Sequence, residues 1–238
     1  MLTLAIEATN PNVPTPGVLL ARVPADEQPP EVLATRGLAS TGRHDDVLLP
    51  SIATLFDEAG IEPRELDEVL VSIGPGGFTA TRLACVTAAV LAEATGARVR
   101  AAETARVAIE TVFQDHNVGG SVVVAMASKH NDAYVAKFDL ARGTFLSRGE
   151  SVGPAAFDTL LLPGDRLVFE GHLPQGMLEI ASSRGVECIP MRLTSEGLLA
   201  CREVAEIVSI EALRPIYPRE PDAVTQWRRR YGSAPGDA

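Results

Sequence analysis

The chain has 238 residues, of which 46% are hydrophobic, and a formal net charge of −10. This size and composition suit a buried core in one large domain or two smaller ones, and the acidic charge argues against a surface that grips nucleic acid unaided. The first residues lack a secretory signal, no run of about 18 apolar residues occurs, and the three cysteines lack CxxC spacing. We expect a cytoplasmic globular protein with no membrane attachment, disulfide or zinc.

Two similar patterns of strand, turn and strand begin near the start and near the middle of the chain. The first joins Met1 to Ile6 with Gly17 to Val23 across a turn rich in asparagine and proline. The second joins Ser121 to Ser128 with Ala133 to Asp139 across the polar turn KHND. The repetition predicts an α/β protein of two related halves.

Helical patterns and a further strand fill the space between these hairpins. Apolar residues on one face predict a helix from His44 that ends at Gly60, a residue type that favours the left-handed cap. A strand over Glu68 to Gly74 leads into a second helix over Thr79 to Ala94, which ends at Gly96.

The predicted halves are residues 1–102 and 103–238, because a short strand pattern near the boundary is followed by a helical one. A third helix is predicted over Glu196 to Ala212, and we expect the last helix of the second half to pack back toward the first half.

The glycine-rich stretch SIGPGGFTATR, which starts at Ser72, resembles a phosphate loop but fails both common patterns. A Walker loop requires Gly-Lys where Thr79 and Ala80 stand, and a dinucleotide fingerprint requires glycine or alanine at Thr79. Thr79 is therefore predicted to cap the following helix, although helix N-termini also attract anions. Glu7 ends the first strand and is either a nucleotide-organising acid or a capping carboxylate. The residues retained for phosphate or nucleotide contact are Glu7, Thr9, Gly76, Gly77 and Thr79.

The second helix carries alanine at every fourth position, namely Ala80, Ala84, Ala88 and Ala92. Such a smooth ridge allows close approach either by the chain's own sheet or by a partner helix. Because other faces of this helix are also apolar, the pattern favours cover on both sides.

No arrangement of side chains supports catalysis or metal binding. His44 in RHDD has Leu48, and no second ligand, four residues later. A nucleophile elbow GxSxG is absent, so we assign no catalytic residue.

Several segments together resemble the TsaB (YeaZ) family. They are LAIEAT near the start, HDDVLLPSIATLFDEAGI, LDEVLVSIGPGGFTATRLACVTAAVLAEATGARV and the late LRPIYPREP. The resemblance implies an actin-like ATPase fold, shared with sugar kinases and Hsp70, with two duplicated α/β halves. The family resemblance also implies a non-catalytic scaffold for a TsaD-like enzyme that makes threonylcarbamoyladenosine next to the anticodon of ANN-decoding tRNAs.

Further partners follow from the same resemblance: a TsaE-like ATPase reached through the complex, and tRNA contacted indirectly. No cofactor of its own is expected, with ATP at the partner interface as the remaining option. The alternatives are an ATP-dependent phosphotransferase of the same superfamily and a self-contained regulatory homodimer. The HxxxH metal pair of TsaD is missing here, because Leu48 occupies its second position.

The resemblance places the partner interface on the two N-terminal helices. The interface residues expected from it are Leu48, Ile52, Leu55, Ala80, Leu83, Ala84, Ala88 and Leu91. The chain departs from the family at Glu7 and Ala8, where aspartate and threonine are usual, and at Ala80 and Thr81, where glycine and leucine are usual.

Overall fold

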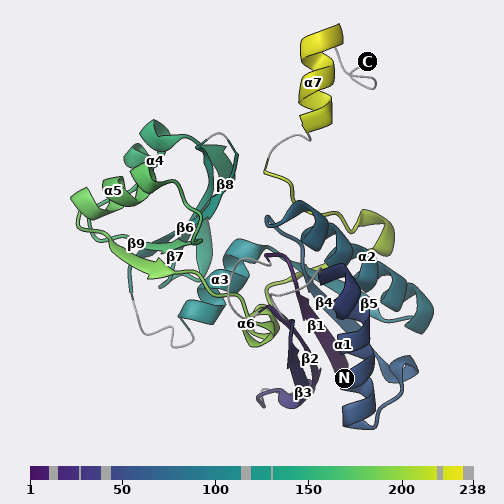
Figure 1. Cartoon of the computed structure of the whole chain (residues 1–238). Helices are drawn as coiled ribbons and strands as arrows, with labels where there is room; N and C mark the ends of the chain where they lie inside the picture. The colour runs from purple at the N-terminus through teal and green to yellow at the C-terminus, as the bar shows by residue number, and fades with distance from the viewer. Residues whose placement is uncertain are drawn as a thin grey trace.

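The order of elements is the same in the two halves of this computed structural model: three strands, a helix, a strand, a helix, a strand and a helix (Figure 1). The structure describes residues 1–10, 16–26, 28–38, 44–113, 119–129, 131–218 and 222–232. The elements of the first half are β1 (Leu2–Glu7), β2 (Gly17–Arg22), β3 (Glu31–Gly37), α1 (His44–Ala59), η1 (Pro63–Glu65), β4 (Glu68–Ser72), α2 (Phe78–Thr95), β5 (Arg98–Ala102) and α3 (Thr104–Val112). Those of the second half are β6 (Ser121–Ala127), β7 (Ala133–Asp139), β8 (Thr144–Val152), α4 (Pro154–Leu160), β9 (Arg166–Phe169), α5 (Gln175–Ser183), β10 (Glu187–Pro190) and α6 (Ser195–Ala200).

Each half builds one mixed sheet with the same strand order. The first half contributes the strands β5-β4-β1-β2-β3 of a six-stranded sheet, and the second half forms a sheet in the order β10-β9-β6-β7-β8. In both, the first three strands form an antiparallel meander and the last two add in parallel beside the first strand. The predicted α/β fold with two duplicated halves is therefore confirmed.

The ends of the first two helices lie where the sequence predicts them. Helix α1 ends before Gly60 and α2 before Gly96, and both glycines adopt positive φ, at 64° and 77°. A side chain at such a position would crowd the backbone, which is why glycine ends these helices.

Helices α3 and α6 pack against each other between the two sheets (Figure 1). Their buried apolar residues belong to one cluster that also contains Leu19 and Leu70 of the first sheet and Val124 and Phe138 of the second. This central layer joins the two halves through a shared core.

The chain returns to the first sheet after α6, which the sequence reading missed. The predicted helix over Glu196 to Ala212 is wrong: α6 ends at Ala200, and β11 (Glu206–Val208) pairs antiparallel with β5, followed by η2 (Ile210–Ala212). A division into residues 1–102 and 103–238 therefore separates β11 from the sheet to which it belongs. The last helix, α7 (Asp222–Tyr231), projects away from both halves (Figure 1).

The crossing of α3 and α6 depends on Gly197. A Cβ atom there would lie 3.1 Å from Cα of Thr111 and would collide with the hydroxyl of that residue. The same hydroxyl is held by the carbonyl of Val107 at 2.8 Å, so it has little freedom to move. The two helices thus touch nearly backbone to backbone at this point.

We expect Gly197→Ala to lower the free energy of unfolding by about 1–3 kcal/mol, because the added methyl group overpacks the contact between α3 and α6. Gly176→Ala in α5 is the matched control, since a Cβ there meets nothing within 4 Å. Urea unfolding of both variants makes the comparison. Equal stability of the two would show that the helices do not cross this closely.

Candidate functional site

A buried chain of polar side chains lies at the end of β1. Oε1 of Glu7 accepts from the amide of Thr9 at 2.9 Å and from its hydroxyl at 2.6 Å. The hydroxyl of Thr104 donates to that of Thr9 at 3.1 Å, and Ser72 lies 2.9 Å from Thr104. Because Thr104 has one hydroxyl hydrogen, Ser72 must be the donor to it. The four side chains form a directed relay that ends on Glu7.

The environment of the Glu7 carboxyl group changes its pKa. The side chain is fully buried, and its Oε2 has no hydrogen-bond partner among the described residues. Burial raises the pKa of this carboxyl above its ordinary value, and the hydrogen bonds from Thr9 only partly offset that effect. This carboxyl therefore ionises less readily than an exposed glutamate.

The glycine-rich loop after β4 packs directly onto the end of β1. The amide of Gly77 donates to the carbonyl of Thr9 at 2.7 Å, and a Cβ at Gly76 would collide with that carbonyl oxygen. On the other side, the carbonyl of Gly74 accepts from the amide of Thr104 at 2.8 Å. The loop therefore uses Gly77, one of the amides predicted to meet a phosphate, to bind the chain's own backbone.

The start of α2 differs from the prediction in one detail. Gly77 is the N-cap residue, without a side-chain cap, and Thr79 is exposed inside the first turn, so the predicted capping role of Thr79 is wrong. The hydroxyl that fixes this turn belongs to Thr81, which donates to the carbonyl of Gly77 at 3.0 Å. Thr81 stands where the family usually has leucine, and that departure was the signal available in the sequence.

Most of the predicted interface residues lie in the chain's own core. The side chains buried there, all but Ala80 in a single apolar cluster, are Leu48, Ile52, Leu55, Ala80, Ala84 and Ala88. The alanine ridge packs α2 against its own sheet, so these six side chains are not available to a partner. Leu83 and Leu91 are half-buried at the edge of the same cluster.

A different face of α2 is exposed and apolar. Val86 and Val90 lie one helical turn apart with 54% and 59% of their surfaces accessible, and Leu83 is the half-buried residue one turn before them. We call Leu83, Val86 and Val90 the outer α2 face. In the same helical layer, Leu49 of α1 is also exposed.

The described part of the late motif RPIYPREP, residues 214–218, reaches the same region. The amide of Ile216 donates to the carbonyl of Ile73 at 2.7 Å, and the ring of Tyr217 stacks on Phe78 with centroids 4.6 Å apart. The guanidinium group of Arg82 lies over the ring of Phe78, 4.4 Å from its centroid. Sequence reasoning did not place Tyr217 at the start of α2, because the contact spans more than half of the chain.

The structure offers no metal centre within the described residues, where no three side chains of His, Cys, Asp or Glu gather. Leu48, at the position of the missing second histidine, is buried in the core, and the side chain of His44 lies outside the described part. None of the helices described combines the length and the apolar character needed to cross a membrane.

Comparison with known proteins places these features in a family. Residues 38–167, more than half of the chain, match the family described as TsaD, tRNA N6-adenosine threonylcarbamoyltransferase. The chain is 30% identical over 193 residues to the uncharacterised protein ML0378 of Mycobacterium leprae, of which it spans about half (48%) while 80% of this chain is covered. It is 28% identical to the uncharacterised protein Rv3421c of Mycobacterium tuberculosis, covering 81% of this chain and 82% of that protein.

Solved structures share the fold. YeaZ from Pseudomonas aeruginosa superposes with a TM-score of 0.68 at 21% identity, covering 91% of this chain and 99% of that one. A second crystal structure, of a protein with similarity to peptidase YeaZ from the same organism, gives a TM-score of 0.70 at 21% identity, with coverage of 92% and 99%. By its sequence match the chain belongs to the TsaD family of tRNA N6-adenosine threonylcarbamoyltransferases, and it has the fold of YeaZ.

Proposed function

We propose that this protein is a non-catalytic scaffold that pairs with a TsaD-like enzyme and so supports threonylcarbamoylation of the adenosine next to the anticodon in ANN-decoding tRNAs. The observation that carries the proposal is the outer α2 face. Two fully formed turns of helix present Val86 and Val90 to solvent, while the opposite side of the helix is buried in the core. Exposed aliphatic side chains in register on one rigid helix are typical of a protein interface.

The proposed interface contains fewer residues than the sequence predicts, because six of the predicted ones are buried in the chain's own core. It consists of the outer α2 face, with the exposed side chains of Leu49 in α1 and Phe78 as neighbouring groups; the half-buried Tyr217 stacks on Phe78. Because α2 begins at the loop that packs on β1, its position is fixed by the fold before any partner binds. Such preorganisation lowers the entropic cost of association.

The buried site supports a role without catalysis. Glu7 is enclosed and carries a raised pKa, and the Gly77 amide is bound to Thr9. Any tRNA contact is indirect in this proposal, because the net charge of −10 opposes binding to phosphates. ATP, where it acts, is held at the partner interface, and a TsaE-like ATPase joins through the complex.

Val90→Arg is expected to weaken association with the TsaD-like subunit of the same organism by at least about tenfold, because it places a charge inside a desolvated contact. Leu162→Arg is the control, since Leu162 is exposed to a similar extent (53%) but belongs to the second half. Light scattering of each variant with and without the partner measures the effect. Normal pairing of the Val90 variant with the TsaD-like subunit would show that the outer α2 face is not the interface.

The same measurement separates the regulatory homodimer from the proposed heterodimer. A second copy of the chain could use the same face, since an isologous dimer places one patch against itself. The proposal expects the TsaD-like subunit to displace any homodimer. A homodimer that persists in the presence of excess partner would favour the regulatory alternative.

The phosphotransferase alternative requires nucleotide binding by the isolated chain. We expect calorimetry with Mg-ATP to show no binding in the micromolar range, because the loop amide of Gly77 is already paired with Thr9 at 2.7 Å. Adenosine diphosphate with magnesium is the control, because it lacks only the terminal phosphate. Micromolar binding that depends on the terminal phosphate would favour the enzyme.

Glu7→Gln tests whether the carboxyl is structural. A carboxyl whose folded-state pKa is raised destabilises the fold as pH rises above its unfolded value near 4.5, by about 1.4 kcal/mol per unit of displacement. Glutamine cannot ionise, so the stability of the variant relative to wild type should increase from pH 4 to pH 8. Urea unfolding across this range measures the difference, and a difference that stays flat with pH would contradict the assignment.

A further inference from the structure

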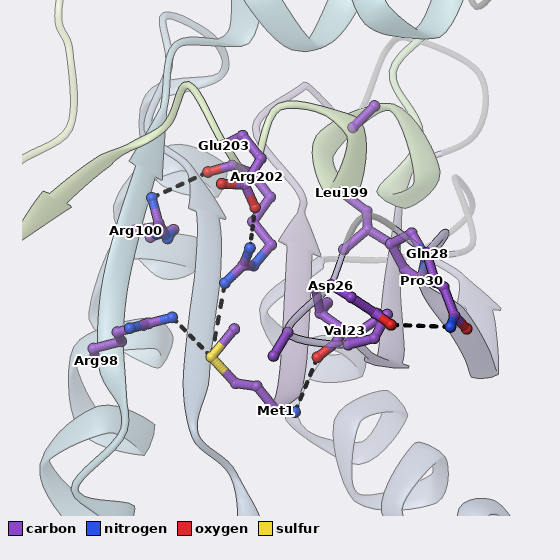
Figure 2. A pocket seen from close by; sticks show the side chains of 13 residues that line it. Met1, Val23, Asp26, Gln28, Pro30, Arg98, Arg100, Leu199, Arg202 and Glu203 are labelled. Carbon is purple, nitrogen blue, oxygen red and sulfur yellow. Dashed lines mark hydrogen bonds and ion pairs between the residues drawn. The ribbon is translucent and has the colours of Figure 1, made fainter.

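A cavity of about 750 Å³ opens at the end of the first sheet opposite the glycine-rich loop. Its walls come from the start of β1, the segment after β2, the start of β5 and the turn after α6 (Figure 2). The side chains used below are Met1, Asp26, Arg98, Arg100, Arg202 and Glu203. None of them takes part in the proposed partner interface.

Three arginines converge beside this cavity on a single carboxylate. Glu68 is fully buried, and the Nε atoms of Arg98, Arg100 and Arg202 lie 2.7, 2.8 and 2.6 Å from its oxygens. Burial alone would raise the pKa of Glu68, but the hydrogen bonds from Arg202, Arg100 and Arg98 outweigh it, so the pKa lies below its ordinary value. One carboxylate cannot satisfy three guanidinium groups, each of which has five N–H donors.

The three arginines differ in the partners of their remaining N–H donors. Arg100 donates through Nη1 to the carbonyls of Arg202 and Ala205. Arg202 also pairs with Glu203 at the surface. Arg98 is different, because its side chain is 43% exposed and, besides Glu68, it contacts a sulfur atom.

That sulfur is the thioether of Met1. Nη2 of Arg98 lies 2.8 Å from Sδ, and Nη2 of Arg202 lies 3.7 Å from the same atom. Figure 2 shows the sulfur between the two guanidinium groups, at the wall of the cavity. A thioether is a weak acceptor, whereas guanidinium groups bind carboxylate and phosphate oxygens through strong charge-assisted bonds. The flexible methionine side chain therefore occupies a position that suits an oxyanion.

We propose that this cavity binds a small molecule through a phosphate or carboxylate group, which takes the place of the Met1 thioether and accepts from Nη2 of Arg98 and Nη2 of Arg202. Glu68 positions both arginines for this contact. Asp26 lies on the wall of the cavity, where it accepts from Gln28 at 3.0 Å. This second acid favours a ligand that also carries a hydroxyl or ammonium donor, and it disfavours a ligand with anionic groups at both ends.

The test titrates inorganic phosphate and lactate into the full chain, with potassium chloride at matched ionic strength as the reference. Lactate is the carboxylate probe because it carries a single carboxylate and a hydroxyl. Methionine methyl groups labelled with ¹³C report the site directly, because Met1 lies in it while Met126, Met177 and Met191 are buried elsewhere. The proposal expects the Met1 signal to shift in a saturable way with phosphate or lactate and not with chloride. The stronger of the two probes identifies the group as phosphate or carboxylate.

Arg98→Gln should weaken this binding by about tenfold or more, because it removes one charge-assisted contact. Arg64→Gln is the matched control, since Arg64 is an exposed arginine that pairs with Glu62 and does not line the cavity. Equal binding by the two variants would overturn the proposal. It would also be overturned if neither anion moved the Met1 signal of the wild-type protein more than chloride does, a result that does not depend on the folding of any variant.

Discussion

The contact between the glycine-rich loop and the backbone of Thr9 determines much of this structure. Gly76 lies so close to the Thr9 carbonyl that no side chain fits, and Gly77 donates to the same oxygen. This single acceptor fixes where β1 ends and where α2 begins. The glycines are needed for close backbone approach, which is also what a phosphate loop requires, and this explains why the motif resembles one.

Two properties of the molecule follow from that contact. The polar relay from Ser72 to Glu7 is closed off beneath the loop, so Glu7 is buried and its pKa is raised. At the same time α2 is held with its alanine ridge against the first sheet, which leaves Val86 and Val90 facing outward. The features that disfavour nucleotide handling and those that favour an interface thus have one structural origin.

The sequence predicts correctly those elements whose ends depend on neighbouring residues. The ends of α1 and α2 follow from Gly60 and Gly96, and the hairpin strands follow from short β-prone runs bounded by turns. After Ala200 the predicted helix is wrong because of a long-range contact. Apolar residues at helical spacing there form the strand β11, because the edge of β5 is free to pair with it. An element's pattern does not reveal which distant element it will meet.

The sequence pattern of α2 did not reveal which of its faces the sheet covers. The apolar positions of α2 occur on several faces, so the pattern could not tell which face the sheet would cover, and the alanines were assigned to a partner. The arginine cluster around Glu68 was also missed, because Arg98 and Arg202 are about a hundred residues apart in the chain and neither belongs to a motif. Both errors concern tertiary contacts that only the folded chain defines.

We propose that this chain supports tRNA modification without performing it. The most direct measurement is the threonylcarbamoyladenosine content of ANN-decoding tRNAs, determined by mass spectrometry after depletion of this protein from its own cells. The account predicts that the modification falls and returns when the wild-type chain or the Leu162→Arg variant is restored, but not with Val90→Arg. Unchanged modification after depletion would contradict the account.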